Sequence, residues 1–315
     1  MLELADILSA RQRIAGRVKR TPLVSSETLS HRLGAPVSLK LELFQKTGSF
    51  KVRGAFNKAL SLSDDQRGRG LVAVSGGNHA QAVAYVASQL GLKSVIVMPE
   101  KTPRNYIEAT RGYGAEVVLV PRVQEAFDEI AKYEKDGWTS VHPFDDPFVM
   151  AGQGTVGLEI VEDLPEVTDV IVSIGGGGFI AGVATAVKSL KPAARIWGVE
   201  TEGADAMSQA LAAGHPVQLE SITSVARTLG APSVTERTLL LAKKYLESVT
   251  LVPDSEAISA LRLILERAKV LTEPAASCTW AAAERLRAHF NPSSQVVLVL
   301  CGGNLSVEDL CRYPA

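Results

Sequence analysis

Short apolar runs alternate with amphipathic segments along most of this 315-residue chain. The apolar runs are rich in β-branched residues and predict strands at 37–43, 71–76, 94–99, 116–121, 169–175, 195–200 and 295–302. Segments with helical spacing lie between most of them, for example at 79–91, 129–137 and 257–270. Continuous apolar strands separated by helices are typical of parallel sheets with helices on both faces. The pattern therefore predicts an α/β fold with doubly wound parallel sheets.

The order of these elements predicts two lobes. The strands between 71 and 144 are enough for a smaller lobe at 70–146, and the segments 1–69 and 147–315 would close into a larger one. Ligands of open parallel sheets bind beyond the carboxyl ends of the strands, so we expect the site in the cleft between the lobes. The chain ends at Ala315, so we expect no C-terminal regulatory domain.

Composition excludes several classes of protein. The net charge is −1, without a basic run, which argues against nucleic acid as a partner. No apolar run approaches the roughly 20 residues that a membrane span needs, and we expect no membrane partner. Cys278, Cys301 and Cys311 lie far apart and show no metal-ligand spacing. Such cysteines suit a reducing compartment, and the start of the chain does not resemble a signal peptide, so we predict a cytoplasmic protein.

The stretch QKTGSFKVRGAF (45–56) places Lys51 where a helix should begin, with Ser49 as the predicted N-cap. The start of a helix carries positive potential, which disfavours an ammonium group and lowers its pKa. Lys51 is therefore a candidate reactive amine. The alternative is an ordinary solvated surface lysine.

Glycine-rich turns follow three of the predicted strands. In VSGGNHA (74–80), Gly76 and Gly77 would let an anion approach backbone N–H groups, although a tight turn capped by Asn78 explains the same residues. In SIGGGGFIAG (173–182), four consecutive glycines are hard to explain by packing alone and predict a phosphate site. Their spacing fits neither a Walker loop nor a dinucleotide fingerprint. In LVLCGGN (298–304), Cys301 is either a small core residue or a thiol facing a ligand.

These motifs, together with HPFDDP and AGQGT (142–155) and the EP of TEPAA (272–276), resemble the fold type II pyridoxal-phosphate enzymes. The resemblance covers nearly the whole chain in the family's order and is closest to the threonine/serine dehydratase and serine racemase group. It implies that Lys51 binds pyridoxal 5'-phosphate as a Schiff base, and it implies a homodimer. The other residues that it assigns to the cofactor are Phe50, Asn78, Gly175, Gly176, Gly177, Gly178, Glu273 and Cys301. The residues that it assigns to the substrate are Ser75, Gly76, Gly77, Asn78 and His79.

The resemblance predicts a dehydratase that converts a β-hydroxy-α-amino acid into a 2-keto acid and ammonia. Lys51 would take the α-proton, and the cofactor ring would accept the electron pair. Cys301 is a weak partner for a ring nitrogen, which favours prompt loss of the β-hydroxyl. Racemisation is the rival outcome. Racemases of this group carry a serine at the position of Gly76, and glycine has no proton to give.

Further departures from the family concern metal and substrate. Glu200 matches a metal ligand of serine racemases, but the second acid's position is Ala206, so we expect no metal. Arg227 and Thr228 stand where the family usually has Asp-Gly. If this loop lines the pocket, Arg227 would meet an extra anionic group or Thr228 would reshape the space for the substrate side chain. The alternative is that Arg227 points to solvent. With the room that Gly76 leaves, this admits a bulkier substrate such as an aryl-serine, beside threonine or serine.

A non-enzymatic protein that binds a phosphate ligand remains the alternative from a different class. It explains the glycine loops, with Lys51 as a charge partner. It does not explain the combination of a lysine, Phe50 and Cys301 around one site.

Overall fold

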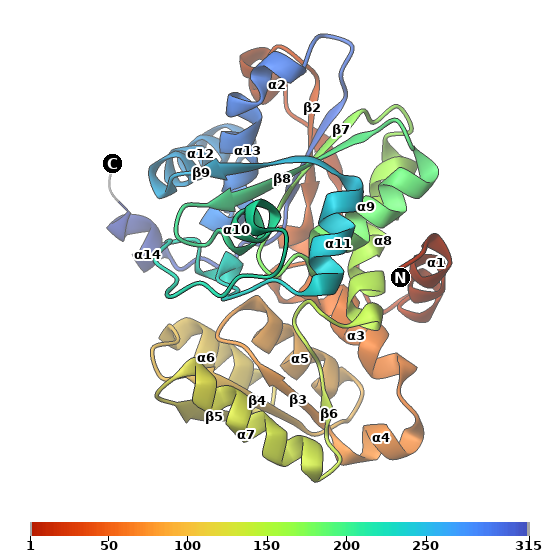
Figure 1. Ribbon diagram of the computed structural model, residues 1–315, viewed down its shortest axis with the longest axis vertical. Helices are drawn as coiled ribbons and strands as arrows, with labels where there is room; N and C mark the ends of the chain where they lie inside the picture. The colour runs from red at the N-terminus through yellow and green to blue at the C-terminus, as the bar shows by residue number, and fades with distance from the viewer. Residues whose placement is uncertain (1, 314–315) are drawn as a thin grey trace.

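The strands form two separate sheets in the computed structural model, which describes residues 2–313. The upper sheet in Figure 1 has the order β1-β2-β10-β7-β8-β9, and the lower one has the order β5-β4-β3-β6. The strands are β1 (Leu23–Ser25), β2 (Val37–Leu41), β3 (Leu71–Val74), β4 (Ser94–Pro99), β5 (Glu116–Val120), β6 (Thr139–Ser140), β7 (Asp169–Ser173), β8 (Arg195–Thr201), β9 (Leu246–Val252) and β10 (Val296–Leu300).

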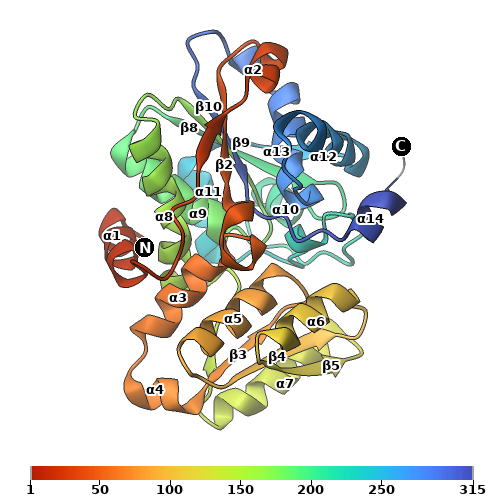
Figure 2. The same ribbon diagram turned by 180° about the vertical axis from the view of Figure 1, so that it is seen from behind.

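Helices cover both faces of both sheets (Figures 1 and 2). Helices α12 and α13 lie on one side of the six-stranded sheet, and α8 and α9 lie on the other. The helices are α1 (Leu4–Arg13), α2 (Glu27–Leu33), α3 (Lys51–Ser61), α4 (Asp64–Arg69), α5 (Asn78–Gln89), α6 (Arg104–Gly112), α7 (Val123–Lys135), α8 (Pro147–Asp163), α9 (Gly178–Leu190), α10 (Ala206–Ala213), α11 (Glu236–Tyr245), α12 (Asp254–Ala268), α13 (Pro274–Arg285) and α14 (Val307–Arg312). The predicted α/β class is confirmed.

Burial on both faces explains the continuous apolar strands. In β3, Leu71 and Ala73 belong to the cluster that includes α5, whereas Val72 packs with α7 residues such as Ala126 and Ile130. Helices α5 and α6 cover one face of this sheet and α7 the other (Figures 1 and 2). Alternate residues therefore face different helices, yet Leu71, Val72 and Ala73 are all buried.

The sequence prediction missed three strands, and each is short or partly exposed. Strand β1 pairs antiparallel with β2, so the larger sheet is not purely parallel as predicted. Strand β6 has two residues, and most residues of edge strand β9 are half-buried or exposed. The predicted strand 71–76 ends at Val74, because the turn that carries Gly76 begins there. Strands β1, β6 and β9 lack the long apolar run that identified the others.

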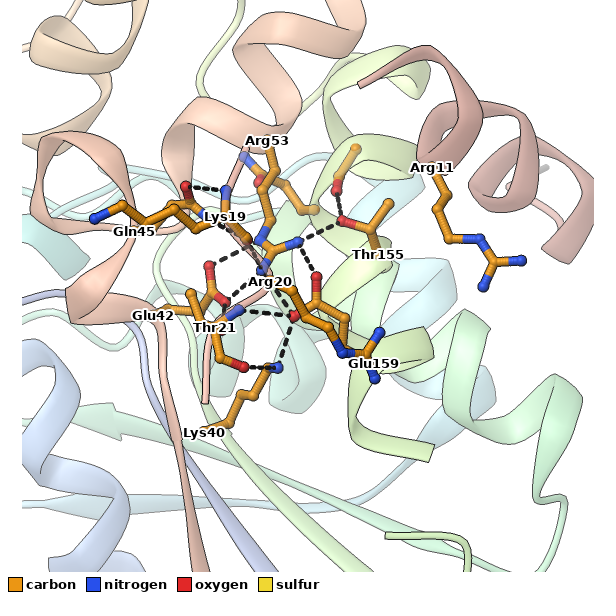
Figure 3. A network of polar contacts seen from close by, with 12 residues as sticks. Arg11, Lys19, Arg20, Thr21, Lys40, Glu42, Gln45, Arg53, Thr155 and Glu159 are labelled. Carbon is orange, nitrogen blue, oxygen red and sulfur yellow. Dashed lines mark hydrogen bonds and ion pairs between the residues drawn. The ribbon is translucent and has the colours of Figure 1, made fainter. Parts of the chain in front are cut away.

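A buried group of opposite charges fixes α3 against its neighbours (Figure 3). Arg53 donates to both carboxylate oxygens of Glu42 at 2.8 and 2.9 Å, and to Glu159 at 2.6 and 2.9 Å. Lys40 donates to Glu159 at 2.6 Å and to the carbonyl of Thr21 at 2.7 Å. Arg53, Lys40 and Glu42 are all 0% exposed. Two cations and two carboxylates thus balance in the interior, and they tie the start of α3 to β2, α8 and the N-terminal segment.

No helix in the part of the chain that the structure describes is long and apolar enough to cross a membrane.

Candidate active site

The starts of α3, α5, α9 and α13 meet beyond the carboxyl ends of the strands. Phe50, before α3, stacks on Phe179 of α9, with ring centroids 3.8 Å apart and planes 14° from parallel. Asn78 of α5 donates to Glu273, before α13, at 2.8 Å. The backbone N–H of Phe50 donates to the carbonyl of Cys301 at 3.1 Å. The positive ends of several helices therefore face one region, which favours an anion there.

Lys51 lies at this junction. Its Nζ donates to the carbonyl of Pro143 at 2.8 Å and lies 5.1 Å from the centre of the Phe50 ring. Burial lowers the pKa of Lys51 to about 8, although Cys301 and Glu273 act in the opposite direction. The predicted direction is confirmed, and loss of hydration is its leading cause.

The predicted cap of this helix is wrong. Phe50 is the N-cap of α3, and Ser49 is extended, with its buried hydroxyl oxygen lacking a partner among residues 2–313. The backbone of Ser49 pairs instead with Gly302 in an isolated antiparallel bridge. That bridge holds the turn after β10 against the segment that precedes Lys51.

The lowered pKa of Lys51 predicts a pH dependence of stability in the cofactor-free protein. Below pH 8 the charged amine is buried at a cost, and this cost disappears between pH 8 and the unfolded value of 10.5. Wild-type stability relative to Lys51→Met should therefore rise as the pH increases from 8 to 10. Urea unfolding of both proteins across this range measures the slope. A stability difference that is constant with pH would contradict the shifted pKa.

The four-glycine loop packs tightly against Phe144. A Cβ at Gly176 would lie 2.2 Å from the Phe144 ring, and one at Gly178 would lie 2.2 Å from its carbonyl oxygen. Gly177 also has a positive φ of 88°. Packing alone therefore requires glycine here, contrary to the reasoning from sequence. The loop nevertheless leaves donors free, because the backbone N–H groups of Gly175, Gly176 and Gly177 have no partner within residues 2–313. A phosphate at the start of α9 fits these unpaired donors.

Glu273 is the centre of a polar network between the two sheets. Its Oε1 accepts hydrogen bonds from Asn78 at 2.8 Å and from Thr228 at 2.9 Å. Asn304 donates to Asn78 Oδ1 at 2.8 Å and to the carbonyl of Thr47 at 2.7 Å. Glu273 Oε2 is buried and has no partner among the described residues, and burial raises the pKa of this carboxyl. The site thus holds an unsatisfied polar atom that a ligand can complete.

The turn after β3 brings together the residues expected at the substrate. Ser75 Oγ accepts from the Gly77 N–H at 3.2 Å, and α5 begins at Asn78 with Gly77 as its N-cap. His79 is 2% exposed, and its Nε2 lies 2.7 Å from the carbonyl of Val141. Burial lowers the pKa of His79 to about 3, helped by the charge of Lys51, so the ring is neutral. His79 therefore ties this turn to the segment after β6.

Two threonines lie directly against this turn. An ideal Cβ at Gly76 would lie 2.6 Å from Thr102 Oγ1, and one at Gly77 would lie 3.4 Å from the methyl group of Thr228. The room that the sequence predicted beside Gly76 is therefore taken by Thr102, a residue that the sequence reasoning did not consider. Nothing in the local sequence pattern distinguishes Thr102 from other loop residues.

The remaining candidate residues, Cys301, Arg227 and Glu200, have different surroundings. Cys301 is 3% exposed, accepts from Ser173 Oγ at 3.4 Å, and has its pKa raised to about 12 by burial, so its thiol is neutral. Arg227 is exposed and its side chain makes no ion pair or hydrogen bond within residues 2–313, whereas Thr228 reaches Glu273.

Glu200 is buried and accepts from the N–H groups of Met207 and Ser208 at 2.8 Å. Its carboxylate thus caps the first turn of α10. No cluster of three potential metal-ligating side chains occurs in the described residues.

Comparison with known families decides between the interpretations of this site. Residues 14–302 match the family described as pyridoxal-phosphate dependent enzymes. The chain belongs to that family. The non-enzymatic alternative is therefore wrong, and pyridoxal phosphate is the cofactor.

Similar proteins lie within one group of these pyridoxal-phosphate enzymes. An L-threonine ammonia-lyase of Thermotoga maritima is 41% identical over 314 residues, covering 99% of this chain and 78% of that protein. Among solved structures, a maize serine racemase matches with a TM-score of 0.94 and 34% identity, over 98% of this chain and 96% of the other. The processed form of threonine deaminase isoform 2 from Solanum lycopersicum matches with a TM-score of 0.91 and 34% identity, over 98% and 85%. The predicted dehydratase and racemase group is confirmed.

Proposed function

We propose that this protein is an L-threonine ammonia-lyase, which converts L-threonine into 2-ketobutyrate and ammonia. The observation that carries the proposal is the 41% identity, over nearly the whole chain, to a protein of that name. The buried amine of Lys51, with its pKa of about 8, supports it. The overall conversion removes water and then exchanges the amino group for oxygen from water.

Different residues of this chain remove the proton, bind the cofactor phosphate and bind the substrate carboxylate. The bound cofactor supplies an acceptor for the electron pair that remains when the α-proton leaves. Lys51 removes that proton, because its depressed pKa leaves much of the amine neutral near pH 8. The free N–H groups of Gly175, Gly176 and Gly177 would hold the phosphate of the cofactor. The turn at 75–77, at the start of α5, receives the substrate carboxylate.

The packing around Gly76 favours a small substrate. Thr102 Oγ1 lies 2.6 Å from the place where a Cβ at Gly76 would be, so no extra space opens there for an aryl group. Threonine and serine therefore fit the proposal better than an aryl-serine. The lobe boundaries, the homodimer, the cytoplasmic location and the role of each site residue stay predictions.

A single assay tests this function. The holoenzyme is incubated with L-threonine, and ammonia, 2-ketobutyrate and the chirality of the remaining substrate are measured together. We expect equal amounts of ammonia and keto acid, with little epimerisation at the α-carbon, because Gly76 carries no proton donor. Phenylserine should react at least tenfold more slowly. Rapid epimerisation without ammonia would identify a racemase instead.

A further inference from the structure

The side-chain hydroxyl of Thr102, a residue beside the site, is not committed to another group of the protein among the described residues. Thr102 lies between β4 and α6, and its backbone N–H donates to the carbonyl of Pro99 at 2.9 Å. Its side-chain oxygen makes no hydrogen bond to another group within residues 2–313, and the residue is half-buried. By contrast, Thr228 donates to Glu273 at 2.9 Å, and Thr110 donates to the carbonyl of Tyr106 at 2.8 Å.

The position of this hydroxyl connects it with the turn at 75–77. It lies 2.6 Å from where a Cβ at Gly76 would be, which is closer than any real Cβ contact. Any side chain at position 76 would have to displace it. The chain thus places a free hydroxyl, carried by another loop, in the space that a side chain of the turn would otherwise occupy.

We propose that Thr102 binds the substrate, with its hydroxyl donating a hydrogen bond to the α-carboxylate held at the turn. This rests on the proposed function, which places the carboxylate at the start of α5. A hydroxyl is neutral and can donate without adding charge to the site. A half-buried donor aimed at an anion gains most of its bonding when the anion arrives and displaces water. Thr102 is therefore a binding residue, and proton removal stays with Lys51.

Two substitutions separate the hydroxyl from the shape of the side chain. Thr102→Val keeps the shape and removes the donor, whereas Thr102→Ser keeps the donor. Hydrogen bonds to charged groups are worth enough that Val should raise KM for L-threonine about tenfold to a hundredfold, with kcat changed by less than about threefold. Ser should stay within about threefold of wild type. Thr110→Val is the matched control, because its hydroxyl bonds only within α6.

A substrate analogue identifies the group that the hydroxyl contacts. L-2-aminobutyrate has the carboxylate and amine of threonine but lacks the β-hydroxyl, so its Kd can be measured by calorimetry without turnover. Thr102→Val should weaken this binding by the same factor as it raises KM for threonine. A loss for threonine alone would overturn the carboxylate assignment, because the hydroxyl would then contact the β-hydroxyl.

Moving the hydroxyl provides the last arm of the test. Gly76→Ser alone should lose affinity, because its Cβ meets Thr102. Gly76→Ser combined with Thr102→Ala removes the conflict and carries the hydroxyl on the turn itself, so binding should recover at least tenfold over the single Ser variant. If Thr102→Val matches wild type in KM and Kd while the unmodified protein still releases ammonia, the inference fails and the proposed function stands. If the unmodified protein releases no ammonia, the proposed function fails, and the calorimetry alone decides the role of Thr102.

Discussion

Lys51→Ala is expected to abolish ammonia release from L-threonine, with kcat lower by about 10³-fold or more. The reason is that Lys51 supplies an amine with a pKa of about 8 at the meeting point of several helix starts. Lys51→Arg should be equally inactive, because a guanidinium remains protonated and cannot accept a proton. Coupled detection of ammonia and keto acid measures the loss.

Lys58→Ala is the control for this experiment. Lys58 lies on the same helix, and its Nζ is 2.6 Å from Asp146, the N-cap of α8. This variant should keep at least a third of wild-type kcat. If Lys51→Ala retains more than a tenth of wild-type turnover, another group removes the proton and the assignment of Lys51 is wrong.

The second large effect concerns stability. Arg53→Ala should lower the free energy of unfolding by about 3–5 kcal/mol, because it leaves the fully buried Glu42 without its counter-charge. Arg104→Ala removes an arginine from an exposed i,i+4 pair with Glu108 and should cost less than about 1 kcal/mol. Urea unfolding compares the two.

The expected loss of stability in Arg53→Ala arises from the unpaired charge of Glu42 and not only from lost packing. Adding Glu42→Gln to Arg53→Ala removes the stranded carboxylate, so the double variant should recover part of the lost stability. The account of this cluster is wrong if Arg53→Ala costs no more than Arg104→Ala.

The parts of the fold that sequence predicts are those with strong local patterns. Strands such as 94–99 and 295–302 are buried on both faces, so their apolar runs are unbroken. Strand β1 gives no such signal, because it has three residues and one neighbour at the edge of its sheet. The sequence predicts the wrong N-cap for α3, because Ser49 has the preferred residue type for that position. A long-range bridge to Gly302 decides the backbone conformation of Ser49 instead.

The residues of the site also divide into those with a local sequence signal and those without one. Lys51, Cys301 and the glycine loop stand in ordered motifs, so they can be recognised from the sequence. Thr102 acts through its position against Gly76, and Asn304 acts through Asn78, which is 226 residues away along the chain. Contacts of this kind depend on how the two sheets are placed, and no local pattern records them. Arg53 is two residues from Lys51 in the recognised motif, yet its burial with Glu42 and Glu159 appears only in three dimensions.

Covalent mapping shows directly whether Lys51 is the amine that binds the cofactor. The holoenzyme is reduced with borohydride and digested, and the peptide that carries the pyridoxyl group is sequenced by mass spectrometry. We expect one modified lysine, Lys51, with loss of the yellow colour that a Schiff base of this cofactor gives and loss of ammonia release in the same proportion. Modification at another lysine, with Lys51 unmodified in the inactivated enzyme, would contradict this assignment.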